Sequence, residues 1–306
     1  MAGVVRIGFY VKEFGKILAY FAAVLGVGAL LAPPLYGLGQ ALVAAGHGDF
    51  LAKYGFQKYF NRALLLASLA LLPVWILWLR VGVGELSWLR ADPIWLRRLG
   101  VGFGLGALAL GVLAGIYLGL GIWEFKLPIP WGALGRALLS AGVVAALEEL
   151  LFRGGLQTVI ARSMGPRGAV WATSALFSVV HFLKPNPALR LETVGWSSGF
   201  ELIPEAFHQF SDPALVLGGW VTLCVFGWVL GMAVERTGSL WMSVGLHAGV
   251  VWVKLSFEKA AICKGSFLPW VGSQLPVGLV PVAVLLLLGM VVVRWESLGG
   301  VREEGR

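Results

Sequence analysis

The chain has 306 residues, of which 58% are hydrophobic and 13% are charged, and its mean hydropathy is +0.83. Soluble globular domains carry about 25% charged residues, so this composition excludes that class and indicates a polytopic membrane protein. The formal net charge is +8, and the basic residues fall largely between apolar segments. This placement favours an anionic lipid surface as partner and offers no soluble arm for nucleic acid.

Apolar segments of about 20 residues, the length that crosses a bilayer core of about 30 Å, recur along the chain. The first carries Pro33 and Pro34, where we expect a kink or a break. We therefore predict an all-α, multi-pass fold of about eight transmembrane helices in a single domain. The predicted spans are 17–45, 63–83, 99–123, 132–153, 168–183, 214–235, 239–257 and 277–295.

Glycines recur at every fourth residue in two of these spans, a spacing that lets helix backbones approach closely in lipid. They are Gly111, Gly115 and Gly119 in the third span, and Gly227 and Gly231 in the sixth. We predict close helix packing at both places.

The longest polar connection runs from residue 184 to residue 213 and contains four prolines. It is too short to form a second domain. We expect it to form a cap or a substrate-entry loop.

The stretch "AALEELLFRGGLQ", residues 145–157, places three charged residues within the fourth span. Charges at mid-membrane depth cost about 2.5–3.5 kcal/mol each, and are therefore usually paired or functional. Glu149 and Arg153 are four residues apart with the acid first, which is the favourable order for an ion pair on one helix face. Glu148 is rotated by about 100° from Glu149 and points to a different neighbour. A pair buried only for folding explains Glu149 and Arg153 but does not account for Glu148.

Two of the four histidines in the chain also lie within predicted spans. His181 follows Phe177 by four residues in the fifth span, and His247 lies among apolar residues of the seventh. The other two, His47 and His208, fall in connections, where we expect them to be exposed. A lone intramembrane histidine is usually a core residue, but two of them together with the charged cluster indicate chemistry.

Glutamate and histidine together can hold a water molecule and remove its proton, and a second histidine can stabilise an oxyanion. Alternatively, Glu148, His181 and His247 could bind a divalent metal such as zinc. The sequence leaves both arrangements open. The two scattered cysteines, Cys224 and Cys263, indicate neither a disulfide framework nor a metal site.

Three separated patterns resemble the motifs of a known family. They are Glu-Glu-xxx-Arg at 148–153, Phe-xxx-His at 177–181 and the histidine of "GLHAG" at 245–249. In order and spacing they resemble the CPBP family of CAAX prenyl endopeptidases and bacteriocin-processing intramembrane proteases, also called the Abi family. The resemblance covers residues from about 132 to 257.

This resemblance implies a helical bundle around a membrane-embedded cavity that hydrolyses a peptide bond of a membrane-associated protein or peptide. The catalytic core would be about 132–257, with accessory helices at about 17–123. By position, Glu148 would activate water with His181, while Glu149 and Arg153 would support the site. His247 would bind a metal or stabilise the oxyanion. The resemblance also implies location in a bacterial inner membrane.

The third motif departs from the family pattern. The family commonly has Asn or Asp four residues after the histidine, whereas this chain has Val251. A valine side chain can neither donate a hydrogen bond nor bind a metal. Ser243, four residues before His247 and on the same helix face, is the candidate substitute.

Two other classes of function use the same residues. A transporter could relay protons or bind an ion through the buried charges, but no inverted repeat is apparent. A non-catalytic member could act as a membrane partner or immunity protein, but such a protein would have no need of both glutamates and both histidines. The sequence therefore favours an intramembrane protease.

Overall fold

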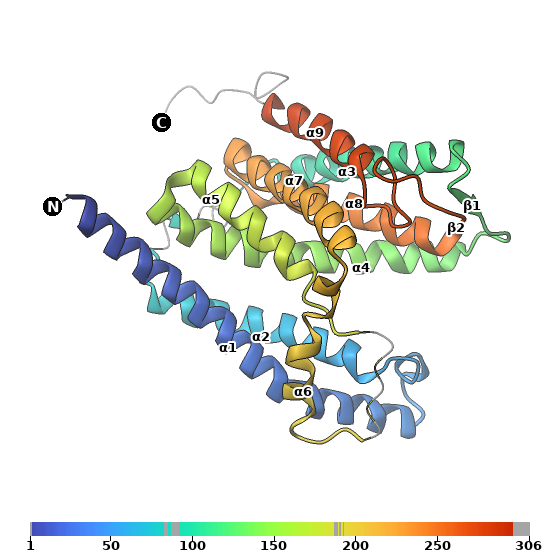
Figure 1. The fold of residues 1–306 in the computed structure, drawn as a ribbon, viewed down its shortest axis with the longest axis horizontal. Helices are drawn as coiled ribbons and strands as arrows, with labels where there is room; N and C mark the ends of the chain where they lie inside the picture. Colours follow the sequence, from blue (N-terminus) through green and yellow to red (C-terminus); the bar gives the residue numbers. More distant parts are fainter. Residues whose placement is uncertain are drawn as a thin grey trace. The chain divides into compact units, whose positions relative to one another are not determined.

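The computed structural model describes residues 2–82, 85–86, 92–186, 189, 191 and 193–295. Within this part of the chain the structure is helical apart from connections and one two-stranded sheet (Figure 1). The chain divides into two compact units. The first consists of residues 1–81 and 179–216, and the second of residues 82–178 and 217–306.

The first unit is built on a pair of long apolar helices. Its elements are α1 (Ala2–Ala44), η1 (Asp49–Leu51), α2 (Phe56–Trp78), α6 (Ser198–Glu205) and η5 (His208–Ser211). Both α2 and α6 pack against α1, and a Cβ added at Gly199 of α6 would overlap the carbonyl group of Ala29. The connection predicted to be a cap therefore contains a helix that lies directly on α1.

The sequence predicted a kink or a break at Pro33 and Pro34, and the helix α1 continues through both prolines without a break. Ala29 and Ala32, on the turns just before the prolines, are fully buried and pack with Phe60 of α2. Proline is tolerated within membrane helices where packing against a neighbour holds the interrupted turn.

The second unit contains the remaining helices and the sheet. Its elements are α3 (Trp95–Gly119), β1 (Trp123–Phe125), α4 (Trp131–Glu149), the π-helical turn η4 (Leu150–Leu156), α5 (Gln157–His181) up to Ser178, α7 (Pro213–Thr237) from Leu217, α8 (Leu240–Ala260), β2 (Ala261–Cys263) and α9 (Leu279–Val293). The helix α8 packs against both α3 and α4.

The fourth and fifth predicted spans are joined by helix rather than by a loop. The π-helical turn follows α4 directly, and α5 begins where that turn ends. The chain bends within α5 at Gly165, whose φ of 71° and ψ of 170° lie outside the helical region. Glycine adopts this left-handed backbone without a steric penalty, and Pro166 follows it.

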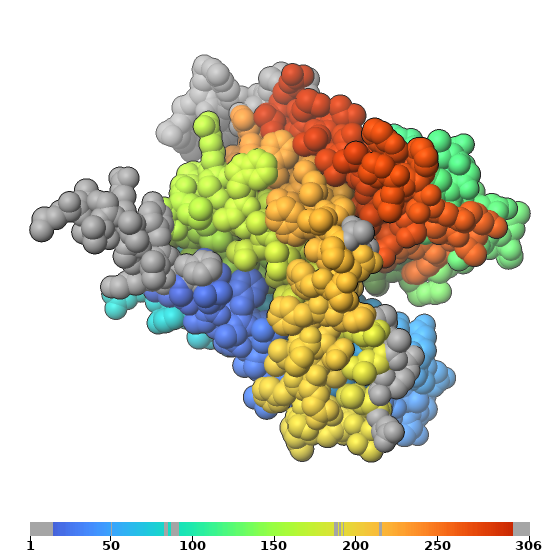
Figure 2. Space-filling model, in the orientation of Figure 1, coloured from blue at the N-terminus to red at the C-terminus, as the bar shows by residue number. Residues whose placement is uncertain are grey.

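The strands β1 and β2 pair antiparallel, with Glu124 opposite Ile262. They close one end of the second unit, where the segment after β2 folds back over a core formed by Tyr117, Trp123, Phe257, Val271 and Leu275. In the space-filling view this orange-red segment lies beside the green segment around β1 (Figure 2).

Close packing of α3 on α8 uses glycines other than those that the sequence pattern singled out. A Cβ added at Gly102 or Gly106 of α3 would overlap backbone atoms of α8, and one at Gly245 or Gly249 of α8 would overlap backbone atoms of α3. In contrast, no neighbouring atom lies within 4 Å of a Cβ built at the three glycines for which the sequence pattern predicted close packing in the third span, so that prediction was wrong. These are Gly111, Gly115 and Gly119.

The prediction for the sixth span is confirmed. A Cβ at Gly227 would lie 3.0 Å from the Cα of Ser174, and one at Gly231 would lie 3.0 Å from the Oε1 of Gln157. Both glycines therefore let α7 approach α5 closely.

Five helices of the described chain are long and apolar enough to cross a membrane, and they lie within α1, α2, α3, α7 and α8. The eight predicted spans all coincide with helices, although eight crossings are not confirmed. The helix α9 is apolar but has 15 residues. The helix α4 has three charged residues among its 19 residues, Arg136 and the adjacent pair Glu148 and Glu149.

A charge pair at the surface of the second unit predicts a pH dependence. Arg162 of α5 donates from Nε to Glu85 Oε2 at 2.6 Å and from Nη2 to Oε1 at 2.5 Å. The bond from Arg162, and a second from the backbone N–H of Gly82, lower the pKa of Glu85 from 4.5 to about 2. A carboxylate with a depressed pKa stabilises the folded protein above its unfolded pKa, and this contribution disappears as the pH falls through the folded pKa.

We therefore expect Glu85→Gln to lower the thermal unfolding midpoint slightly at pH 6, because exposed pairs contribute little. The difference from the parent protein should shrink as the pH falls from about 4.5 to about 2. A thermal unfolding series in detergent across that range measures it. A difference that stays constant with pH would show that the pair makes no contribution.

Candidate active site

The side chain of Glu149, the last residue of α4, is fully buried and is held by three donors. Arg153 Nη1 donates to its Oε1 at 2.9 Å, and His247 Nδ1 lies 2.8 Å from the same oxygen. The hydroxyl of Ser243 donates to the other oxygen, Oε2. A buried carboxylate is costly unless it is paired and hydrogen-bonded, and these contacts meet both conditions.

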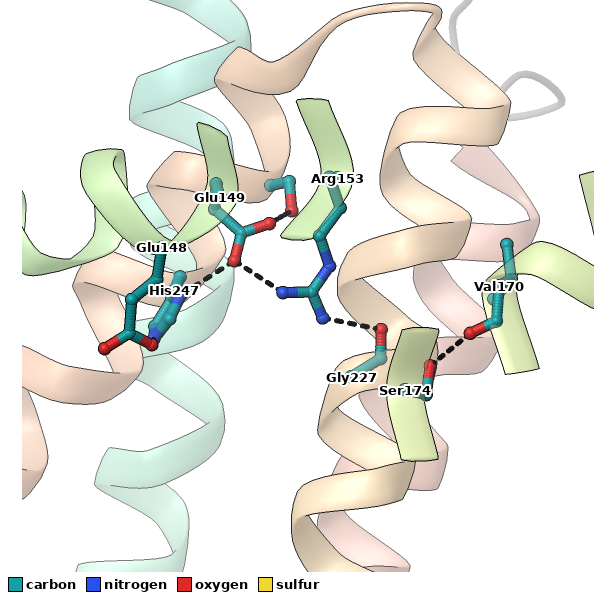
Figure 3. Close-up of polar contacts among 8 residues, drawn as sticks. Glu148, Glu149, Arg153, Val170, Ser174, Gly227 and His247 are labelled. Carbon is teal, nitrogen blue, oxygen red and sulfur yellow. Dashed lines mark hydrogen bonds and ion pairs between the residues drawn. The ribbon is translucent and has the colours of Figure 1, made fainter. Parts of the chain in front are cut away.

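Arg153 is the middle residue of the π-helical turn η4, whose sequence is "LLFRGGL". Its side chain runs between two elements, because Nη1 contacts Glu149 while Nη2 donates to the carbonyl oxygen of Gly227 at 3.0 Å (Figure 3). The guanidinium also lies 4.6 Å from the centroid of the Phe177 ring, a favourable cation–π distance. Turns of this π type occur frequently at functional sites.

The contact with Gly227 depends on how closely α7 approaches α5. A Cβ at Gly227 would lie 3.1 Å from the Cβ of Ser174 and 3.0 Å from its Cα. The hydroxyl of Ser174 turns away and donates to the carbonyl oxygen of Val170 at 2.6 Å (Figure 3). Small residues on both helices thus bring the Gly227 carbonyl within reach of Arg153.

His247, on α8, is buried between the two glutamates. An ionised carboxylate only accepts hydrogen bonds, so the bond to Glu149 places the ring proton on Nδ1. The other nitrogen, Nε2, then has its lone pair toward Glu148, whose Oε2 lies 3.8 Å away. Phe177 and Phe226 pack edge-on against the ring at 5.8 and 5.4 Å between centroids.

Glu148 differs from its neighbour in exposure. Its side chain is 21% exposed, whereas that of Glu149 is 0% exposed. In Figure 3 the carboxylate of Glu148 lies beside the ring of His247, and the carboxylate of Glu149 points toward Arg153. The adjacent glutamates therefore lie against opposite ring nitrogens of His247, and the ion pair with Arg153 is made by Glu149. Of the two carboxylates, that of Glu148 is the one exposed to water.

The structure thus brings together Glu148, Glu149, Arg153 and His247. His181 is the last residue of α5, one turn after Phe177, and is partly buried. It falls in the first compact unit, and its predicted partnership with Glu148 stays a prediction. His47 and His208 are exposed, as predicted for residues in connections.

Two members of the site were missed or misassigned from the sequence. The carbonyl of Gly227 carries no sequence signal for its bond to Arg153. Ser243 was assigned as a substitute for the missing Asn or Asp, but its hydroxyl hydrogen is directed to Glu149. Val251, one turn after His247, is partly buried. The four-residue spacing between Ser243 and His247 placed Ser243 beside the site. It did not predict that the hydroxyl of Ser243 would contact Oε2 of Glu149.

The residues predicted as alternative metal ligands do not form a recognisable set. Among the residues that the structure describes, no three His, Cys, Asp or Glu side chains are grouped as they would be around a metal ion. His247 Nδ1 is directed to a carboxylate rather than to an open position. Glu148 and His247 alone would supply two ligands, fewer than the three that catalytic zinc sites draw from the protein.

Comparison with known proteins agrees with the resemblance read from the motifs. Residues 130–253, less than half of the chain, match the sequence model of a family described as type II CAAX prenyl endopeptidase Rce1-like. That segment runs from the start of α4 into α8 and contains the whole cluster around Glu149. A search of the curated proteins gave no match.

The match confirms the predicted family and indicates a protease, which acts on a protein or peptide substrate at the membrane. The long apolar helices indicate an integral membrane protein. Over residues 130–253 the chain is similar to the Rce1-like family of type II CAAX prenyl endopeptidases.

Proposed function

We propose that the protein is an intramembrane endopeptidase in which Glu148 activates a water molecule, with His181 as its partner and with assistance from His247. The observation that carries the proposal is the placement of Glu148 Oε2 at 3.8 Å from His247 Nε2. Two atoms at this separation leave positions from which one water oxygen can hydrogen-bond to both at about 2.8 Å. A base in contact with substrate water is the first requirement of hydrolysis.

The reaction then follows from the protonation states in the cluster. Glu148 takes a proton as the water oxygen adds to the peptide carbonyl carbon, and the carbonyl oxygen becomes an oxyanion. When the tetrahedral intermediate collapses, the C–N bond breaks and the proton passes from Glu148 to the leaving amine. Because Nδ1 is held by Glu149, the imidazole of His247 keeps one orientation throughout. This fixed orientation parallels the role of a buried carboxylate beside a catalytic histidine.

Glu149 and Arg153 act as support in this proposal. Both side chains are fully buried, so neither contacts water directly. Their bonds to Ser243, His247 and Gly227 tie three helices to the end of α4. A site held within about 0.5 Å of its productive geometry needs such a supporting shell.

The substrate class follows from the family and the membrane location. We propose a membrane-associated protein or peptide in a bacterial inner membrane. Because the family model is named for prenyl endopeptidases, a farnesylated C-a-a-X peptide is the first substrate to test, and an unprenylated membrane-anchored peptide of the same sequence is the second.

The test compares cleavage of both peptides in liposomes by the parent protein and by Glu148→Gln, His181→Ala and His247→Ala. Loss of a general base costs about 10²–10⁴-fold in rate, and we expect Glu148→Gln to lose at least 10²-fold. Glu258→Gln is the matched control, because Glu258 lies on α8 in an exposed ion pair with Lys254. This variant should cleave both peptides at the parent rate. Full activity of Glu148→Gln would refute the proposal.

A chelator arm separates the two forms of water activation left open by the sequence. If Glu148 and the histidines act without a metal, cleavage should be unchanged after dialysis against a chelator. If chelation abolishes cleavage and zinc restores it, the mechanism must be rewritten around a bound metal.

A further inference from the structure

The connection between α1 and α2 carries a group of basic side chains outside the candidate active site. Both helices are long and apolar enough to cross a membrane, so their connection, residues 45–55, lies where a bilayer presents its headgroups. Lys53 is in the turn before α2, Lys58 is in the first turn of α2, and Arg62 is one turn later. We call Lys53, Lys58 and Arg62 the basic cluster.

No carboxylate of the described residues forms an ion pair with the basic cluster. The acid nearest in sequence, Asp49, is exposed in η1. Two basic residues near other connections of the described chain are paired with acids, Lys264 with Glu124 at 2.9 Å and Arg98 with Asp92 at 2.7 Å. The basic cluster is thus a concentration of positive charge that no acidic side chain of the described residues neutralises in an ion pair.

The arrangement is unfavourable without an anion. Lys58 and Arg62 are four residues apart on α2, and like charges at this spacing repel each other. They also lie at the N-terminal end of the helix, where the helix dipole is positive and favours acidic groups. The first turn of α2 contains no acidic residue, and Gly55 provides no side-chain cap.

One aromatic ring contacts both lysines of the basic cluster, and exposed leucines lie on the neighbouring helix α1. The ammonium groups of Lys53 and Lys58 lie 5.3 and 5.8 Å from the centroid of the same ring, that of Tyr54, so both charges converge on one place. On α1, Leu38 and Leu42 are 58% and 41% exposed, and lie one turn apart. Apolar helix surface leading to converging cations matches a molecule with acyl chains and a negatively charged head.

We propose that the basic cluster is a binding site for the phosphate of one anionic phospholipid, whose acyl chains lie along the exposed apolar face of α1. The phosphate oxygens accept hydrogen bonds from the two lysines that contact Tyr54 and from Arg62. Lysine and arginine are the side chains that bind phosphate most strongly, through charge-assisted hydrogen bonds.

The test counts lipids on the full-length protein. The protein in maltoside micelles is titrated with dioctanoyl phosphatidylglycerol, and native mass spectrometry measures the lipids retained and their dissociation constant. Phosphatidylcholine with the same chains and inorganic phosphate are titrated in parallel. We expect one phosphatidylglycerol to bind most tightly, and Lys58→Gln/Arg62→Gln to weaken that step about 20-fold, since each basic residue near an anionic headgroup contributes severalfold.

The matched control is Lys126→Gln/Arg136→Gln, which removes the same charge from two exposed, separate positions in the second unit. It should bind the lipid as the parent does. If both double variants bound phosphatidylglycerol equally weakly, the effect would be a general attraction between the lipid and the net positive charge of the protein. That result would contradict a specific site at the basic cluster. Competition by inorganic phosphate at the lipid's own concentration would overturn the lipid assignment, and unchanged binding in Lys58→Gln/Arg62→Gln would overturn the proposal.

A single variant keeps the proposal testable if the double variant does not fold, as judged by circular dichroism. Lys53→Gln changes an exposed residue in the turn, outside α2. We expect it to weaken the same binding step about fivefold. Parent-like binding by a folded Lys53→Gln protein would contradict the role of the Tyr54 contact.

Discussion

Replacing Arg153 by methionine is expected to lower the free energy of unfolding by about 3–5 kcal/mol, the usual cost of removing one partner from a buried ion pair. The change removes the donor that lies 2.9 Å from Glu149 Oε1 and the donor that lies 3.0 Å from the carbonyl oxygen of Gly227. It leaves the carboxylate of Glu149, which is fully buried, with only Ser243 and His247. Equilibrium unfolding in mixed micelles measures the effect.

A double variant shows whether the loss comes from the unmatched charge. Glu149→Gln/Arg153→Met removes both charges, so it should be less destabilised than the sum of the two single variants. Arg136→Met, at an exposed position near the start of α4, is the control and should change stability by less than about 0.5 kcal/mol. If the effects of the two single variants simply add, the contact between Glu149 and Arg153 contributes no coupling energy.

The second large effect is expected at the contact between α3 and α8. There Gly245→Val should lower the free energy of unfolding by about 3 kcal/mol or more. A Cβ at Gly245 would overlap the carbonyl oxygen of Leu99. Backbone atoms cannot rotate aside as a side chain can, so the two helices would have to separate. Because His247 lies two residues further along α8, its position beside Glu148 and Glu149 would change as well.

Gly104→Val and Gly111→Val are the matched controls on α3. No atom lies within 4 Å of a Cβ built at either position. Both should therefore keep parent stability, or gain slightly from valine's lower backbone entropy in the unfolded chain. Unfolding in mixed micelles compares the three variants. A larger loss in the controls than in Gly245→Val would show that a different face of α3 packs against its neighbours.

The glycine pattern of α3 predicted close packing in the correct helix but at the wrong positions. A four-residue repeat is present in α3 at Gly111, Gly115 and Gly119, but these positions face open space. The contact is made by Gly102 and Gly106 in the same helix. A repeat tells that small residues share a face, but not which face meets another helix, because that depends on the neighbour.

The active-site prediction was strongest where it rested on local geometry. The rotation between Glu148 and Glu149 and the spacing from Glu149 to Arg153 are properties of one helix, and the structure places them as predicted. The bond of Ser243 to Glu149 joins residues 94 positions apart. No spacing rule reaches across such a separation, so the sequence placed Ser243 on the helix face of His247 but did not predict its bond to Glu149.

The sequence by itself determined the class of protein, the positions of the apolar helices and the resemblance to the family, because composition and hydrophobic length follow from the bilayer and each motif is a short local pattern. Only the tertiary structure decided that Glu149 is the buried acid shared by Arg153, Ser243 and His247, and that Glu148 is the partly exposed one. The physical reason is that burial and hydrogen-bond partners depend on which helices meet, and that choice is made by packing between distant segments.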